Sequence, residues 1–270
     1  MKNYLTYPCK VMNITQGYIG NYSHEPHTTG SPKDFPWDEA CGSTGRSPMY
    51  CPCDEMIIKR IYTKGTNTIW LESTTPVYFA DGTSDYVTLM VTHPNDSDIN
   101  RLKVGQKFKR GKLICYEGTD GNATGNHFHF AVGKGKIKGN GWTQNSKKKW
   151  VLTTVNGSQK PETMFFVDPE FTTTVKKTQG IKFKELPTEE SFLPEIGYFK
   201  RGDTHENIGK IAEFMYKNFP LYTKKQALGN YYGRNLAYSI KEFKKRTKLP
   251  VHDKIDKDTL KKLVELGFRY

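Results

Sequence analysis

The sequence has few cysteines and no long apolar run. No stretch of about 18 consecutive apolar residues occurs in its 270 residues, and the mean hydropathy is −0.70, so we expect no membrane span. The cysteines are odd in number, and the CPC at 51–53 has no second pair that would complete a zinc site. Reduced thiols fit a cytoplasmic protein better than a disulfide-stapled secreted one. We therefore expect free thiols at Cys9, Cys41, Cys51, Cys53 and Cys115.

The N-terminal segment also lacks the features of a secretory signal. The stretch MKNYLTYPCKVMNITQGYIG has neither a long apolar core nor a small-residue cleavage site. We expect the protein to be made in a cytoplasm without a signal peptide.

Helical periodicity is missing from the first part of the chain, up to about residue 170. The segments 55–63, 67–74, 76–82 and 85–93 are short, rich in β-branched and aromatic residues, and separated by turn signals such as KGTN and DGTSD. This pattern predicts a mainly antiparallel β-sheet domain over residues 1–175.

The composition changes after residue 175. Residues 176–196 contain two prolines, many charges and no clean period, which predicts a linker. Beyond it, apolar residues recur at steps of three and four in 207–219, 235–247 and 256–268. Asp256 is the expected N-cap of the last of these helices, which closes at Gly267. We predict a small three-helix domain over residues 197–270.

Basic charge is concentrated in this helical part. The chain carries a net charge of +13, and residues 197–270 alone hold 17 Lys and Arg against 8 Asp and Glu. Such an excess favours an anionic partner, and nucleic acid, anionic membranes, anionic wall polymers or simple solvation of the surface all satisfy it. Its position in the helices favours a targeting role for them over a catalytic one.

The stretch GNHFHF at 125–130 places His127 and His129 two residues apart. Successive side chains of a β-strand point to opposite faces, so both imidazoles lie on one face while Phe128 and Phe130 pack into the other. A single buried histidine would be an ordinary hydrogen-bonded residue. A pair is costly to bury without a partner, and a metal ion is the obvious one.

The remaining histidines separate into two groups. His205 and His252 occur in loop-like contexts of the helical part, and we interpret them as surface residues. His93 ends the strand-like YVTLMVTH, whereas His24, His27, Asp34 and Asp38 all fall in one polar segment that runs into FPWDEA. Catalytic zinc takes three protein ligands and keeps an open position, so this segment can supply the partners that His129 lacks.

The order of these motifs resembles the lysostaphin-like zinc endopeptidases of bacterial and phage cell-wall lysis. The chain has His24 and Asp38, then VTH at 91–93, VGQKFKRGKLI at 104–114, GTDGNATGNHFHFAV at 118–132 and a closing FVDPEF at 166–171. The resemblance spans about residues 14–171 and implies a metallopeptidase domain that binds Zn²⁺.

Carried over by position, the resemblance implies that His24, Asp38 and His129 bind the zinc. His93 and His127 would move protons during catalysis. Tyr18 would donate to the oxyanion, with Tyr22 as its competitor. One departure is the separation of fourteen positions between His24 and Asp38, where the family commonly has four. An outward loop would explain it, and it leaves His27 or Asp34 as alternative ligands.

The helical part, from YFKRGDTHENIGKIAEFMYKNF to DKIDKDTLKKLVELGF, resembles the peptidoglycan-binding domain of many wall hydrolases. Together the two resemblances imply a monomeric phage endolysin that cuts stem or cross-bridge peptides of peptidoglycan and binds the wall with its anionic polymers. It would accumulate in the host cytoplasm and then be released to the cell wall. An amidase that cuts the sugar–peptide amide, or a non-catalytic wall-binding regulator, remains the alternative. We expect no nucleic-acid partner, since no motif beyond charge points to one.

Overall fold

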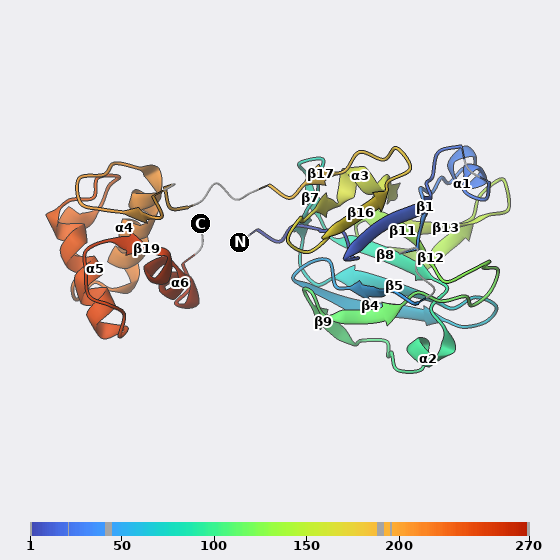
Figure 1. Cartoon of the computed structure of the whole chain (residues 1–270), viewed down its shortest axis with the longest axis horizontal. Coiled ribbons are helices and arrows are strands. Elements are labelled where there is room, and N and C mark those ends of the chain that lie inside the picture. The colour runs from blue at the N-terminus through green and yellow to red at the C-terminus, as the bar shows by residue number, and fades with distance from the viewer. Residues whose placement is uncertain (1, 21, 41–44, 188–191, 195, 269–270) are drawn as a thin grey trace. The chain divides into compact units, whose positions relative to one another are not determined.

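The computed structural model describes residues 2–20, 22–40, 45–187, 192–194 and 196–268. The chain divides into two compact units, Lys2–Leu186 and Pro187–Tyr270, and each is described by itself (Figure 1).

The first unit is built mainly of strands. Its three short helices are α1 (Glu25–Thr29), α2 (Asp96–Ile99) and α3 (Pro161–Met164). Its strands are β1 (Val11–Gln16), β2 (Trp37–Glu39), β3 (Pro48–Tyr50), β4 (Glu55–Tyr62), β5 (Thr68–Ser73), β6 (Val77–Tyr78), β7 (Ser84–Asp85), β8 (Val87–Thr92), β9 (Lys107–Lys109), β10 (Leu113–Tyr116), β11 (Phe128–Lys134), β12 (Ile137–Gln144), β13 (Trp150–Thr154), β14 (Ser158–Gln159), β15 (Phe166–Val167), β16 (Thr174–Lys177) and β17 (Lys184–Glu185). The strands predicted from the alternating segments 55–63, 67–74 and 85–93 are confirmed as β4, β5 and β8, whereas only two residues of 76–82 form a strand.

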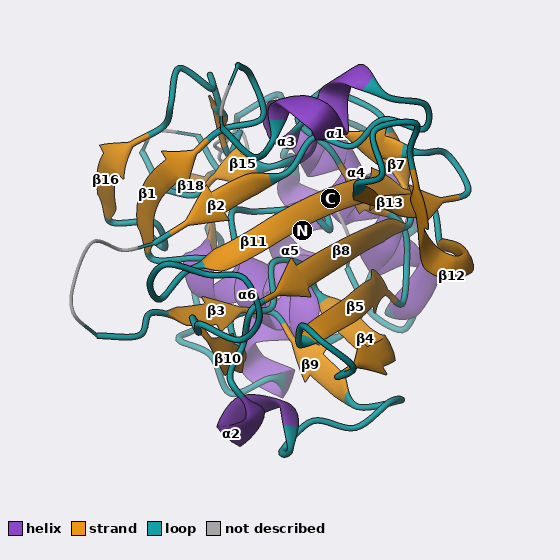
Figure 2. Ribbon diagram, turned by 90° about the vertical axis from the view of Figure 1, so that its right-hand side faces the viewer, coloured by secondary structure: helices purple, strands orange, loops and turns teal. Residues whose placement is uncertain are grey.

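The main sheet runs in the order β16-β1-β2-β11-β8-β5-β4-β9, with β14 also paired to β11 (Figure 2). Its pairs are antiparallel except for β1 with β16. The strand β11 therefore lies in the middle of the sheet, between β2 and β8, and both neighbours can place side chains beside its own.

The two faces of β11 differ as the sequence predicts. Phe128, Phe130 and Val132 are fully buried in the main hydrophobic core, together with residues of β5 and β8 that point the same way. Burying a large aromatic side chain contributes roughly 2–3 kcal/mol, so these alternating residues fix which face of the strand turns inward. His129 and Ala131 consequently face the opposite side of the sheet.

The first unit extends further than the predicted boundary at residue 175. The strand β16 pairs with β1, and β17 pairs with β15, so the chain up to Leu186 belongs to this unit. The predicted linker 176–196 is thus partly sheet. Because β16 is an edge strand whose residues are all exposed, its sequence shows no hydrophobic period that could have revealed it. Residues 188–191 and 195 of the predicted linker lie outside the described residues.

The second unit contains the helices α4 (Glu206–Asn218), α5 (Arg234–Arg246) and α6 (Lys257–Glu265), a short 3₁₀ turn η1 (Lys225–Ala227), and the strand pair β18 (Tyr198–Phe199) and β19 (Ile255–Asp256). The three helices coincide with the three periodic stretches of the sequence. Asp256 is confirmed as the N-cap of α6, where its side chain accepts from the backbone N–H of Thr259.

The apolar helix faces of the second unit pack together, with one exception. The predicted inward residues of α4 include Ile208, Ile211 and Met215, which are fully buried. Tyr216, predicted on the same face, is instead 40% exposed and points away from this core. Apolar spacing alone does not distinguish the edge of a helix face from its centre.

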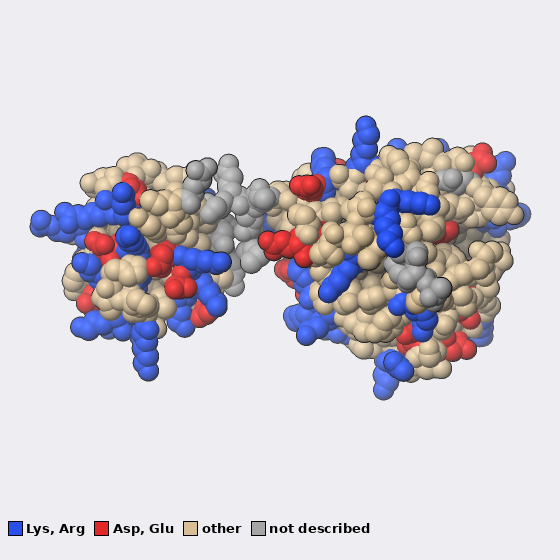
Figure 3. Space-filling view, viewed as in Figure 1, with Lys and Arg blue, Asp and Glu red and all other residues tan. Residues whose placement is uncertain are grey.

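Cysteine and surface charge complete the description. Cys51, Cys53 and Cys115 are free thiols and buried, Cys9 is buried as well, and Cys41 lies outside the described residues. No helix in the described part of the chain is long and apolar enough to cross a bilayer. On the face drawn in Figure 3, Lys and Arg are spread over both units and do not form a single stripe.

Candidate metal centre

Strand register brings Asp38 and His129 together. Asp38 on β2 is the pairing partner of His129 on β11, and residues opposite each other on neighbouring strands place their side chains on one face. The His129 Nδ1 atom lies 3.0 Å from Asp38 Oδ1. Two residues that are 91 positions apart in the sequence are therefore neighbours in the sheet.

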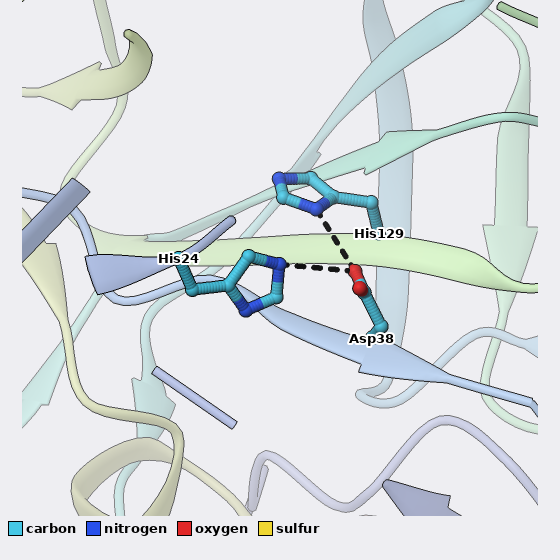
Figure 4. A group of neighbouring side chains, drawn as sticks. All are labelled: His24, Asp38 and His129. Carbon is cyan, nitrogen blue, oxygen red and sulfur yellow. Dashed lines mark hydrogen bonds and ion pairs between the residues drawn. The ribbon is translucent and has the colours of Figure 1, made fainter. Parts of the chain in front are cut away.

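His24 completes the group from outside the sheet. It immediately precedes the helix α1, and its side chain is 1% exposed. Its Nε2 atom lies 3.2 Å from Asp38 Oδ1, and one ligand atom from each of His24, Asp38 and His129 falls within 4.8 Å of the others (Figure 4). The three residues that the resemblance implies as ligands thus converge on one point.

A hydrogen bond at the other nitrogen of the His24 ring shows which nitrogen carries the proton. Nδ1 of His24 lies 3.0 Å from the carbonyl oxygen of Gly17, and a carbonyl can only accept, so Nδ1 carries the ring proton. Nε2 of the neutral ring then presents a lone pair to the Asp38 carboxylate. This buried nitrogen has no hydrogen-bond partner. Two acceptors that face each other in this way fit a cation between them, and two imidazoles with one carboxylate are a zinc donor set.

The Asp38 carboxylate is held in its charged form. Burial by itself would raise its pKa, but the His129 and His24 imidazoles beside it outweigh burial and hold the pKa below its usual range. Its second oxygen, Oδ2, accepts from Gln16 Nε2 at 3.2 Å. Gln16 lies opposite Asp38 in the β1–β2 pair, a register that no sequence pattern of this chain indicates.

His93 and His127 lie beside the three candidate ligands. Their ring centroids are 4.5 Å apart, and Nε2 of His127 is 3.9 Å from Asp38 Oδ1. Nδ1 of His93 is 2.7 Å from the carbonyl of Asp120, and Nδ1 of His127 is 2.9 Å from the carbonyl of Gly125. Both rings therefore carry their proton on Nδ1, and in the neutral ring Nε2 is free to accept one.

The backbone at His93 is strained. Its φ of +83° lies in the left-handed region that non-glycine residues rarely occupy. The turn packs closely against Gly118, where an added Cβ would come within 2.2 Å of the His93 carbonyl oxygen. Burial lowers the pKa of His93 to about 4, so the ring is neutral over the physiological range.

All five of these residues line one cleft of about 800 Å³, but Tyr18 does not. The Tyr18 hydroxyl donates to the Glu162 carboxylate of α3, and the ring packs edge-on against Phe35. The hydroxyl that the resemblance directs at the oxyanion thus bonds to α3 in this structure and does not enter the cleft. Its competitor Tyr22 lines the cleft and is 99% exposed.

The segment between His24 and Asp38 also separates the two alternative ligands. Asp34 is fully buried and accepts from the backbone N–H of Leu152 and from Ser158, which ties the segment to β13 and removes Asp34 from the cleft. His27 does line the cleft, with its ring centroid 5.8 Å from that of His129. Burial lowers the His27 pKa to about 3, yet its nitrogens do not join the group of converging ligand atoms.

Comparisons with known proteins give partial likenesses. No family model matches the sequence. Morphogenesis protein 1 of Bacillus phage B103 is 34% identical over 140 residues, which are 51% of this chain and 34% of that protein, so the chain spans about a third of its relative's length.

Two solved structures that resemble the chain are peptidases. A zinc-containing peptidase from Vibrio cholerae is 19% identical, covering 48% of this chain and 36% of its own, with a TM-score of 0.33. The catalytic domain of lysostaphin from Staphylococcus simulans is 19% identical, covering 49% of this chain and 80% of its own, with a TM-score of 0.28.

Proposed function

We propose that this chain is a zinc-dependent endopeptidase that hydrolyses peptide bonds in the stem or cross-bridge peptides of bacterial peptidoglycan. The observation that carries the proposal is the Nε2 atom of His24, which lacks a hydrogen-bond partner and faces the Asp38 carboxylate, with the imidazoles of His93 and His127 beside it in an open cleft. The motif order of the sequence supplies the substrate class.

The residues in the cleft have separate tasks in this reaction. His24, Asp38 and His129 would hold Zn²⁺, which when bound supplies Lewis-acid activation of a carbonyl and of a water molecule. His93 and His127 accept a proton at Nε2 from the attacking water and return it to the leaving amine nitrogen as the C–N bond breaks. Positioned proton transfer of this kind contributes about 10²–10⁴-fold in rate.

The hydrogen bonds to backbone carbonyls prepare both imidazoles for this task. With Nδ1 of His93 held by Asp120 and Nδ1 of His127 held by Gly125, neither ring can rotate its Nε2 away without losing a bond. Both acceptors therefore stay directed at the cleft, and the reaction needs little reorganisation.

The test is lysis of purified cell walls. Wild-type protein should clear a wall suspension, and chelation or the His129→Ala substitution should abolish clearing. His205→Asn is a matched control, because His205 is an exposed N-cap of α4 and asparagine keeps a capping acceptor. Full clearing by the His129→Ala variant would reject the proposal. Mass spectrometry of the digest distinguishes an endopeptidase, which frees an amine within the peptide, from an amidase, which frees the stem from its sugar.

The wall-binding role of the second unit is part of the proposal. Its concentration of Lys and Arg fits the anionic polymers of a wall, and its periodic stretches resemble a peptidoglycan-binding domain. Full-length His129→Ala protein should sediment with intact walls without cutting them. A protein that stays in the supernatant at physiological salt would argue against an anchor.

We further propose that the protein is a monomer encoded by a phage and acts from the host cytoplasm at lysis. The likeness to a Bacillus phage protein supports the phage origin. Deletion of the gene should delay host lysis and leave fully infectious particles inside the cells. Particles that are released on time but cannot infect would instead place the enzyme in the virion.

A further inference from the structure

The cleft has a second end, one row of side chains away from the candidate ligands. On the outer face of the sheet, His129 pairs with Thr92 and Thr92 pairs with Thr68. Two residues further along the same strands, Ala131, Met90 and Trp70 form the next row. A β-strand rises about 3.3 Å per residue, so the two rows are roughly 7 Å apart on one face.

Three partly exposed aromatic rings cover this second row. Tyr62 on β4, Trp142 on β12 and Trp150 on β13 all line the cleft, and we call them the aromatic wall. The centroid of Trp142 lies 4.8 Å from that of Tyr62 and 5.1 Å from that of Trp150. Trp150 is 51% exposed.

The aromatic wall is held rigid from beneath. Trp70 is fully buried, meets Trp142 edge-on at 4.9 Å, and donates from Nε1 to the carbonyl of Gly141 at 3.1 Å. The Arg60 guanidinium lies 4.9 Å from the Trp70 ring centroid and 5.6 Å from that of Trp142. An exposed tryptophan on so firm a support marks a binding surface, because little side-chain entropy is lost when a ligand covers it.

The free charges of the cleft are positive. Lys64 lies in the β4–β5 turn, two residues after Tyr62, and Lys149 directly precedes Trp150. Both lysines line the cleft, and neither ammonium has a hydrogen-bond or ion-pair partner within the described ranges. Among the described residues that line the cleft, Asp38 is the sole acid, and its carboxylate is engaged by His24 and His129. The cleft therefore complements a negative group.

We propose that the aromatic wall, Lys64 and Lys149 bind a peptide segment that carries a free carboxylate and an aliphatic side chain close to the scissile bond. The proposal rests on the proposed peptidase function and names the substrate feature that the cleft selects. The carboxylate pairs with the ammonium groups, and the aliphatic chain covers the Trp142 and Trp150 rings. A separation of roughly 7 Å corresponds to about two residues of extended peptide. A neutral sugar on the same rings would leave both lysines without a partner.

The experiment compares soluble peptides that differ only in one carboxylate. For each position flanking the scissile bond, on either side, a pair of peptides is made. One peptide of the pair carries a free carboxylate at that position and the other carries the amide. At one position, wild type should show a kcat/KM about fivefold higher for the acid than for the amide. This ratio corresponds to the free energy of one exposed ion pair. Lys149→Gln should abolish this preference by slowing the acid peptide alone. Lys147→Gln is the matched control, since Lys147 is exposed in the same β12–β13 turn and does not line the cleft.

The rings have their own variants. Trp150→Ala should raise KM for both peptides with kcat and zinc content unchanged, and Trp150→Phe should restore most of the affinity. If no position distinguishes acid from amide, or if Lys149→Gln and Lys147→Gln behave alike, the proposal is wrong. If wild type binds stem-free glycan strands, and Trp150→Ala loses this binding without a change in peptide kinetics, the aromatic wall binds sugar instead.

Failure of the peptidase proposal can be recognised separately. Calorimetric binding of the acid and amide peptides to the His129→Ala variant needs no turnover. A preference for the acid there, in a protein whose wild type cuts neither peptide nor wall, would keep the binding surface and reject the activity. Turnover of both peptides without a preference for the acid would keep the peptidase activity and reject the proposed binding surface.

Discussion

The imidazole rings of His93 and His127 lie with their centroids 4.5 Å apart, and each ring donates from Nδ1 to a backbone carbonyl. His93 directly follows β8 and His127 directly precedes β11, so the two rings meet because these strands are neighbours. In the proposed reaction their Nε2 atoms are the proton acceptors next to the candidate metal centre. The proposed division between metal-holding and proton-carrying histidines leads to separable predictions.

Loss of a proton carrier should leave metal binding intact. His127→Ala and His93→Ala should retain stoichiometric zinc and lose about 10²–10⁴-fold in rate on walls. His24→Ala should lose both metal and activity, because Nε2 of His24 is one of the converging ligand atoms. Elemental analysis alongside turbidity clearing measures the two properties. Zinc loss from His127→Ala would show that this ring is a ligand.

Metal removal should destabilise the first unit and spare the second. A ligand that binds the native state alone stabilises it by about 4 kcal/mol at a thousand times its dissociation constant. All four tryptophans, Trp37, Trp70, Trp142 and Trp150, lie within Lys2–Leu186, so their fluorescence follows that unit. The fluorescence melting temperature should fall on chelation and recover with zinc. In the His24→Ala variant it should respond to neither treatment.

Gly118 should be irreplaceable because of its contact with His93. A Cβ there would meet the His93 carbonyl at 2.2 Å and the Asn95 side-chain oxygen at 2.4 Å, so Gly118→Ala must displace the strained turn. We expect reduced kcat with zinc retained. Gly125→Ala is the control, since a Cβ at Gly125 meets nothing within 4 Å and the substitution keeps the backbone carbonyl that accepts from His127. Equal activity of the two variants would show that the position of His93 does not limit the rate.

Removing the Tyr18 hydroxyl should not affect catalysis. That hydroxyl donates to Glu162, and burial raises the pKa of Tyr18 well above its usual range. Tyr18→Phe should cost about 1 kcal/mol of stability through the lost hydrogen bond while kcat stays unchanged. Tyr22→Phe, at an exposed position in the cleft, is the informative comparison. A large fall in kcat for Tyr18→Phe would restore the role predicted from sequence.

The second unit should lose stability in acid through Asp256. Burial would raise the Asp256 pKa, but hydrogen bonds from Thr259 and Lys244 outweigh it and lower the pKa. A lowered pKa means that the carboxylate's contribution is complete above its unfolded pKa of about 3.9 and is lost as pH falls through the folded value. Helical circular dichroism of the full chain should show this loss.

Two substitutions at Asp256 separate charge from capping. Asp256→Asn keeps an N-cap acceptor and removes the partner of the buried Lys244 ammonium, so it should cost about 2 kcal/mol and flatten the acid dependence. Asp256→Ala should cost about 1 kcal/mol more, because the cap is also lost. Identical stabilities of the two variants would contradict a capping role.

Much of the architecture follows from local sequence. The alternation in β11 fixes its buried face because moving Phe128 and Phe130 to water would cost several kcal/mol, which also commits His129 to the other face. The three helices of the second unit follow from apolar spacing in the same way. The edge strand β16 could not be predicted, since an exposed edge is held by backbone hydrogen bonds and carries no hydrophobic signal.

The candidate metal centre required the tertiary structure. The resemblance read from the sequence pointed to His24 and Asp38 but left His27 and Asp34 as alternatives, because the choice depends on which atoms meet across strands. Strand register places Asp38 opposite His129, and a hydrogen bond from the backbone N–H of Leu152 holds the Asp34 side chain outside the cleft. Sequence by itself determined which faces are buried, through hydrophobic free energy acting on neighbouring residues. Only the tertiary structure decided the direction of each polar atom, because hydrogen-bond geometry joins residues that are distant in the chain.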